Sequence, residues 1–164
     1  MKKFELTSEF VTFLGKKLFR IKALVSFGDV KEGELGGLVE KEENLDQSGN
    51  AWVSGDARVY GDARVYGNAW VSGDARVYGD AWVSGDARVQ NCRDYSATSC
   101  FGSENRTTTF FRTKDGGISV RCGCFYGTLA EFREKVKERH GGRRLAKEYL
   151  MLADLMEFRL SKDE

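Results

Sequence analysis

The chain has 164 residues and a formal net charge of +1. A chain of this length is expected to form one modest domain, or a repeat with small additional segments. A chain so close to neutral is not a globally basic nucleic-acid binder, so no bulk nucleic-acid partner is expected. No apolar run reaches the ~18 residues of a membrane span, and no apolar segment typical of a signal peptide follows the first lysines. We therefore expect a cytoplasmic protein with no membrane partner.

The first segment, residues 1–36, is predicted to be a β cap. Residues 10–14 and 18–24 are rich in apolar and β-branched side chains and flank a short turn at residues 15–17, as in a β-hairpin. Residues 31–48 form an irregular lead-in to the repeat that follows. The open end of a repeat of strands is a sheet edge, which natural proteins cover. We assign that covering role to this hairpin.

A six-residue motif fills residues 49–90 in seven consecutive copies, such as GNAWVS and GDARVY. Residues two apart on a strand share a face, so each copy points its Ala and its Val inward. Glycine followed by Asp or Asn supplies the turn between strands. Three short strands and three turns make a triangular coil of 18 residues, and we predict a parallel β-helix over residues 37–102.

The outward positions carry Trp or Arg and, two residues later, Ser or Tyr. An 18-residue coil stacks these side chains into ladders, and exposed aromatic ladders usually mark an interface. We predict contacts between subunits through this set: Trp52, Trp70, Trp82, Tyr60, Tyr66 and Tyr78. A platform on which sugars or bases stack is the alternative for the same residues.

Residues 103–164 follow a different pattern. Residues 107–113 and 118–122 flank Lys-Asp-Gly-Gly, a hairpin signal. Thr128 and Glu131 form a capping box that opens a helix, and a second apolar stripe predicts a helix over residues 143–159. The segment is thus predicted to be a small ββαα module.

The repeat resembles the hexapeptide-repeat family of left-handed parallel β-helices, and the left hand rests on that resemblance, since parallel crossovers are generally right-handed. The lead-in RIKALVSFGDVKEGELGGLVEKEENL resembles uncharacterised hexapeptide-repeat proteins of bacteria, prophages and phages. The tail TTTFFRTKDGGISVRCGCFYGTLAEFREKVKERHGG resembles a module that recurs at the ends of phage and prophage proteins. The resemblance implies a homotrimer and a phage or prophage setting, with the host cytoplasm as location. It supplies no catalytic residues.

The known enzymes of this family depend on histidines that the repeat of this chain does not contain. Hexapeptide acyltransferases use a histidine base between neighbouring subunits, and γ-type carbonic anhydrases need three histidine ligands, whereas the only histidine is His140, outside the repeat. We predict no catalytic residue and no cofactor, with an acyltransferase as the third alternative. Four thiols, Cys92, Cys100, Cys122 and Cys124, are numerous enough for zinc, but their spacing favours small buried side chains, so no metal is assigned.

Cationic side chains cluster in the second half of the chain, around a Gly-Gly pair before a predicted helix N-terminus, where an anion is favoured. The predicted anion-binding set is Arg112, Lys114, Arg121, Arg139, His140, Arg143, Arg144 and Lys147. The first functional hypothesis is a non-enzymatic oligomeric protein that sequesters an anionic, nucleotide-like host signal. A structural scaffold or inhibitor of protein interactions is the rival.

Overall fold

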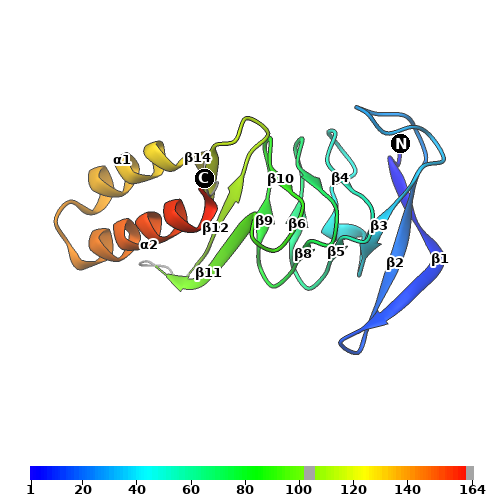
Figure 1. Ribbon diagram of the computed structural model, residues 1–164, viewed down its shortest axis with the longest axis horizontal. Helices are drawn as coiled ribbons and strands as arrows, with labels where there is room; N and C mark the ends of the chain where they lie inside the picture. The colour runs from blue at the N-terminus through cyan, green and yellow to red at the C-terminus, as the bar shows by residue number, and fades with distance from the viewer. Residues whose placement is uncertain (102–105, 162–164) are drawn as a thin grey trace.

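A computed structural model describes residues 1–101 and 106–161, with side chains for all of these except Cys100 and Phe101. The chain is elongated: an N-terminal hairpin lies at one end, stacked parallel strands in the middle and two helices at the other end (Figure 1). Within the described ranges no helix is long and apolar enough to cross a membrane. The fold is therefore mainly β, with a two-helix part at its C-terminal end.

The N-terminal hairpin is confirmed. It consists of β1 (Phe4–Phe13) and β2 (Lys16–Ala23), paired antiparallel. Its turn is Leu14-Gly15, one residue earlier than expected, and both residues have positive φ, 51° and 76°, as two-residue hairpin turns require. Strand β2 pairs antiparallel with β3 (Leu35–Val39), which in turn pairs parallel with the repeat. The hairpin thus extends one face of the stack.

Two polar side chains close the N-terminal end of the stack. Lys3 is buried, and its Nζ donates a hydrogen bond to the carbonyl of Ala51 at 2.8 Å. The short 3-10 helix η1 (Glu42–Asn44) stands where the first coil lacks a strand. The side-chain amide of Asn44 donates to the carbonyls of Gly61 (3.1 Å) and Ala63 (2.9 Å). These bonds satisfy backbone groups that no neighbouring strand reaches.

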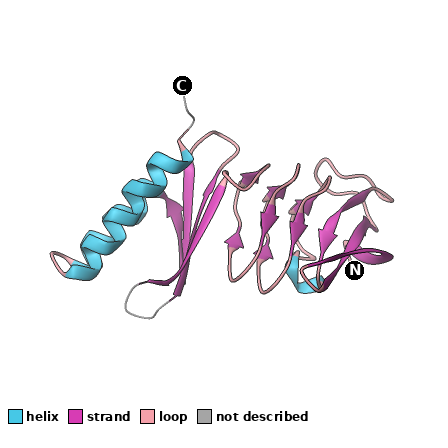
Figure 2. Cartoon of the chain, turned by 60° about the horizontal axis from the view of Figure 1, so that its bottom comes forward, coloured by secondary structure: helices cyan, strands magenta, loops and turns pink. Residues whose placement is uncertain are grey.

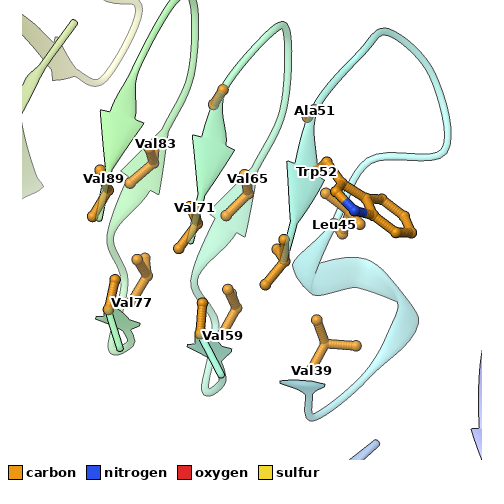
Figure 3. Close-up of a cluster of buried hydrophobic side chains, with 14 of the residues drawn as sticks. Val39, Leu45, Ala51, Trp52, Val59, Val65, Val71, Val77, Val83 and Val89 are labelled. Carbon is orange, nitrogen blue, oxygen red and sulfur yellow. The ribbon is translucent and has the colours of Figure 1, made fainter. Parts of the chain in front are cut away.

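The repeat folds into seven two-residue strands that stack in parallel with a register of 18 residues, so that Val53 pairs with Val71, which pairs with Val89. All inward alanines and valines of the repeat are buried (Figure 3). The strands are β4 (Trp52–Val53), β5 (Arg58–Val59), β6 (Arg64–Val65), β7 (Trp70–Val71), β8 (Arg76–Val77), β9 (Trp82–Val83) and β10 (Arg88–Val89).

Three faces result, and they differ in length. The first contains β4, β7 and β10, the second β3, β5 and β8 with the hairpin added, and the third only β6 and β9. At each corner a glycine takes a positive φ. At Gly49, for example, φ is 67° and an added Cβ would lie 2.7 Å from the carbonyl oxygen of Gly67 in the next coil. Glycine is required there for both reasons.

Among the described residues the C-terminal module contains four strands, of which the sequence predicted the two middle ones. They form an antiparallel sheet: β11 (Tyr95–Phe101), β12 (Arg106–Arg112), β13 (Ile118–Cys122) and β14 (Phe125–Thr128). The sheet is followed by α1 (Leu129–His140) and α2 (Arg144–Leu160) (Figure 2). The predicted hairpin and both helices are confirmed, including the capping box of Thr128 and Glu131.

Strand β11 corrects the expected extent of the stack. Residues 95–101, assigned from the sequence to the β-helix, pair antiparallel with β12 instead of continuing the parallel ladders. The reason is visible at Arg93, which is exposed and does not enter the inward alanine position. Tyr95 and Phe111 are buried in the same core cluster as the inward valines, so the module closes this end of the stack. The expected boundary between residues 102 and 103 lies outside the described residues.

Candidate ligand-binding groove

The third face of the stack is hollowed because it is short and bounded on both sides. Two adjoining cavities, of about 870 Å³ and 620 Å³, lie over it and share Glu43, Arg64, Trp82 and Arg121. Helix η1 supplies Glu43, strands β6 and β9 supply Arg64 and Trp82, and β13 supplies Arg121. We call these two cavities together the groove. Its volume is in the range of small-molecule sites.

The centre of the groove is an aromatic pair flanked by two guanidinium groups. The rings of Tyr66 and Trp82 meet edge to face, with centroids 6.0 Å apart and planes at 89°. The Cζ atom of Arg121 lies 5.3 Å from the Trp82 ring and 5.8 Å from the Tyr66 ring. Arg64 lies 5.7 Å from the Trp82 ring. These are cation–π distances, and they hold both arginines beside the rings.

Two polar atoms beside the groove are buried without a hydrogen-bond partner: the Tyr66 hydroxyl and Arg121 Nε. Buried polar groups in native proteins nearly always have a partner, and leaving one unmade costs free energy. Both groups can donate a hydrogen bond. Protein atoms cover both of them in this structure, so a group in the groove reaches them only when a neighbouring side chain moves.

The charges around the groove are mixed, but its two central arginines remain unpaired. On the rim, Lys41 donates to Asp62 at 2.9 Å. That hydrogen bond raises the pKa of Lys41 and lowers the pKa of Asp62. Among the described residues no carboxylate forms a salt bridge with Arg64 or Arg121. The two guanidinium groups beside the aromatic pair are therefore not neutralised by a carboxylate of the described chain.

The predicted anion-binding set does not form one site. Arg112 lies at the C-terminal end of α2, where its Nε donates to the Leu160 carbonyl at 2.7 Å and its Nη1 to Asp94 at 2.9 Å. Lys114 lies in the turn between β12 and β13. Arg121 alone lines the groove.

The other five residues of the set lie at the opposite end of α2, roughly 25 Å away for a helix of this length. They are Arg139, His140, Arg143, Arg144 and Lys147. His140 stacks on the Tyr149 ring, with centroids 5.9 Å apart, and Arg144 pairs with Glu148 at 3.5 Å. The five residues that are close in sequence therefore stay together, and Arg112 lies at the other end of α2.

The aromatic set is also corrected. Trp52 is fully buried within its own chain, where its ring meets Phe27 edge to face at 5.4 Å, so it cannot contribute an exposed surface. Tyr60 is buried beside Phe13 of the hairpin, with centroids 5.5 Å apart. Both lie where segments from outside the repeat cover the first coils.

The remaining four aromatic residues lie on three different faces. Trp70 is half-buried on the first face, where its Nε1 donates to the Ser54 hydroxyl at 3.1 Å. Tyr78 is exposed on the second face and stacks on Tyr60 at 5.3 Å. Tyr66 and Trp82 belong to the groove. The six residues therefore do not share one continuous surface.

The cysteines give no metal centre in the described part of the chain, where no three His, Cys, Asp or Glu side chains are grouped closely enough to hold an ion. Cys92 and Cys124 are exposed, and Cys122 accepts a hydrogen bond from the Thr108 hydroxyl at 3.2 Å. The side chain of Cys100 lies outside the described residues.

Sequence reasoning missed the groove because its walls come from segments outside the repeat. Lys41 directly precedes η1, Glu43 belongs to η1, and Thr109 belongs to β12. One signal was available: the 18-residue period places Arg64 and Trp82 on the same ladder, with Tyr66 beside them.

Comparison with known families supports the architecture. The family model described as the YdcK beta solenoid repeat matches two adjacent stretches, residues 57–73 and 69–85. A comparison with curated proteins finds none that matches this chain. The stacked parallel strands and this repeat match define a β-solenoid repeat protein with a two-helix C-terminal part.

Proposed function

We propose that this protein is a non-enzymatic binding protein whose groove holds a small anion that carries a flat ring, such as a nucleotide. The single observation that carries the proposal is the cluster at the centre of the groove, where the Arg64 and Arg121 guanidinium groups flank the partly exposed Trp82 ring. A phosphate suits both guanidinium groups, because hydrogen bonds from arginine to phosphate are charge-assisted.

The aromatic pair gives the ring of the ligand a place to bind. Trp82 is 36% exposed and borders both cavities, so part of its indole is available for stacking against a base. Stacking of a base on an aromatic side chain contributes about 1–3 kcal/mol. Arg64, near the Trp82 ring, adds a second cation within reach of a phosphate.

The wider hypothesis is a sponge for an anionic nucleotide-like signal in the host cytoplasm, encoded by a phage or prophage. It is supported by the resemblance of the lead-in and tail, and by the position of His140, the chain's only histidine, away from the groove. We propose a left-handed hexapeptide type of coil on the same resemblance. The resemblance implies a homotrimer, to which the buried Trp52 could contribute no contact; the pairing of two copies argued below is the alternative assembly.

The test is binding of defined nucleotides to the purified full chain. Cyclic dinucleotides, cyclic oligonucleotides and adenosine and guanosine monophosphates are titrated by calorimetry, beside the corresponding nucleosides and inorganic phosphate. We expect at least one nucleotide to bind about tenfold or more tightly than its nucleoside and than phosphate, since both parts contribute.

The variant Arg121→Gln should weaken that binding about 10–100-fold, the usual effect of removing a charge-assisted hydrogen bond. Arg76→Gln is the matched control, because the Arg76 guanidinium also lies over an aromatic ring, that of Phe13, but on the second face and away from the groove. If no nucleotide binds, or if the two variants behave alike, the groove is not the site and the scaffold hypothesis is preferred.

A further inference from the structure

Helix α2 exposes a straight apolar stripe that no part of the described chain covers. Met151, Leu155 and Phe158 are 72%, 56% and 84% exposed. They follow one another at spacings of four and three residues, which places them on one side of a helix. The opposite side of α2 is buried, with Tyr149 and Met156 packed into the core of the module. We call the three exposed residues the α2 stripe.

Such a stripe is unusual on a monomer, because contiguous exposed apolar surface marks an interaction site more often than single apolar residues do. Other exposed apolar side chains of the chain are scattered, such as Leu14 in the turn of the hairpin and Tyr126 on β14. None of the stripe residues lines the groove. The stripe therefore needs an explanation separate from ligand binding.

Charges beside the stripe are arranged with opposite signs at its two ends. Lys147 lies one turn before Met151, and within the described chain it forms no salt bridge. Asp154 lies one turn after Met151 on the same flank. It pairs through Oδ1 with Arg133 at 2.8 Å but remains largely exposed, so its second oxygen is available to another cation.

We propose that the α2 stripe is the contact between two copies of this chain, with the two α2 helices antiparallel about a two-fold axis near Met151. In that arrangement Lys147 lies beside the partner's Asp154, and Arg144 beside the partner's Phe158. A parallel pairing would place Lys147 beside Lys147 and Asp154 beside Asp154, which is repulsive. Charge complementarity thus selects a second copy in the antiparallel orientation.

A two-fold contact of this kind closes on itself, because the same surface serves both subunits. The helix ridges at residues 151, 155 and 158 interdigitate as in other helix pairs. One helix pair is smaller than a standard interface of about 800 Å² per partner. We therefore expect a dimer that forms and dissociates with concentration.

The test is sedimentation velocity of the full chain across a concentration range from about 5 to 500 μM. A monomer–dimer equilibrium is expected, and Leu155→Glu should shift it about tenfold or more towards monomer. Leu14→Glu is the matched control: it makes the same change at an exposed leucine far from α2 and should leave the equilibrium unchanged. The charge reversals Lys147→Asp and Asp154→Lys should each weaken the dimer, and the double variant should restore it.

Orientation is tested by disulfide formation in the variants Met151→Cys and Phe158→Cys, with the new bond identified by peptide mass spectrometry. An antiparallel pair centred on Met151 places the two 151 positions in contact and the two 158 positions about 20 Å apart. A disulfide between the 151 positions is expected and one between the 158 positions is not. A chain that stays monomeric, a dimer indifferent to Leu155→Glu, or a trimer in which the stripe is dispensable would overturn the proposal.

Discussion

Replacement of Trp52 by alanine tests how the N-terminal segment completes the solenoid. The sequence makes Trp52 and Trp82 equivalent, since both occupy the third position after a repeat glycine. In the structure the indole of Trp52 is fully buried against Phe27, and the Trp82 indole borders the open groove. We expect Trp52→Ala to be the more damaging of the two.

The expected loss in free energy of unfolding for Trp52→Ala follows from the area that the indole buries. An aromatic side chain buries about 150–250 Å², and at about 25 cal/mol per Å² this corresponds to about 4–6 kcal/mol as an upper bound. Substitutions of buried Trp by Ala cost about 3–5 kcal/mol, which we take as the expected loss for Trp52. For Trp82→Ala we expect about 1–2 kcal/mol, because water fills the vacated space and no closed cavity forms.

Urea denaturation followed by far-UV circular dichroism measures both losses without relying on tryptophan fluorescence. Trp52→Phe is the informative second variant. It keeps an aromatic ring and removes an indole N–H that is buried without a partner, so it should cost less than half as much as Trp52→Ala. An equal loss for Trp52→Ala and Trp82→Ala would refute the inferred packing of the first coil.

Three further outcomes follow from individual contacts. Burial lowers the pKa of Lys3 to about 8 from the solvated value of 10.5. Between these two pH values the unfolded chain binds more protons than the folded chain, so the free energy of unfolding rises as the pH increases from 8 to 10.5. The urea midpoint of the wild type minus that of Lys3→Met should therefore increase from pH 8 to pH 10.5. A difference that stays constant would contradict the lowered pKa of Lys3. Gly49→Ala should cost more than Gly79→Ala, because an added Cβ at Gly49 meets the next coil and one at Gly79 meets nothing within 4 Å; thermal unfolding of the two variants compares them. Thr128→Ala should lower the free energy of unfolding by about 1 kcal/mol through loss of the α1 cap, whereas Thr128→Ser, which keeps the hydroxyl, should be nearly neutral in the same urea titration.

The groove and the α2 stripe lie on different parts of the molecule, so their tests are independent. Loss of nucleotide binding in Arg121→Gln leaves the dimer proposal untouched, and a monomeric Leu155→Glu variant should still bind a nucleotide. Should both tests fail, the solenoid would be left as a scaffold whose contacts lie on its remaining faces.

The sequence by itself determined the body of this protein. Its inward Ala and Val positions, its glycine corners and its 18-residue register are local and periodic, and each copy of the repeat meets the same neighbours one coil away. For the same reason the hairpin at β1 and β2 and the capping box at Thr128 could be predicted, because each depends on residues close together in the chain.

Only the tertiary structure decided which repeat positions are exposed. Trp52 is buried and Trp82 lines a groove because η1, residue 27 and the sheet of the C-terminal module pack onto different coils. Arg121 approaches Tyr66 across 55 positions of sequence, and no period connects β13 to the repeat. The predicted cations do not form one cluster because Arg112 packs at the C-terminal end of α2, at the Leu160 carbonyl. Arg144 lies at the N-terminal end of that helix, roughly 25 Å away at 1.5 Å per residue.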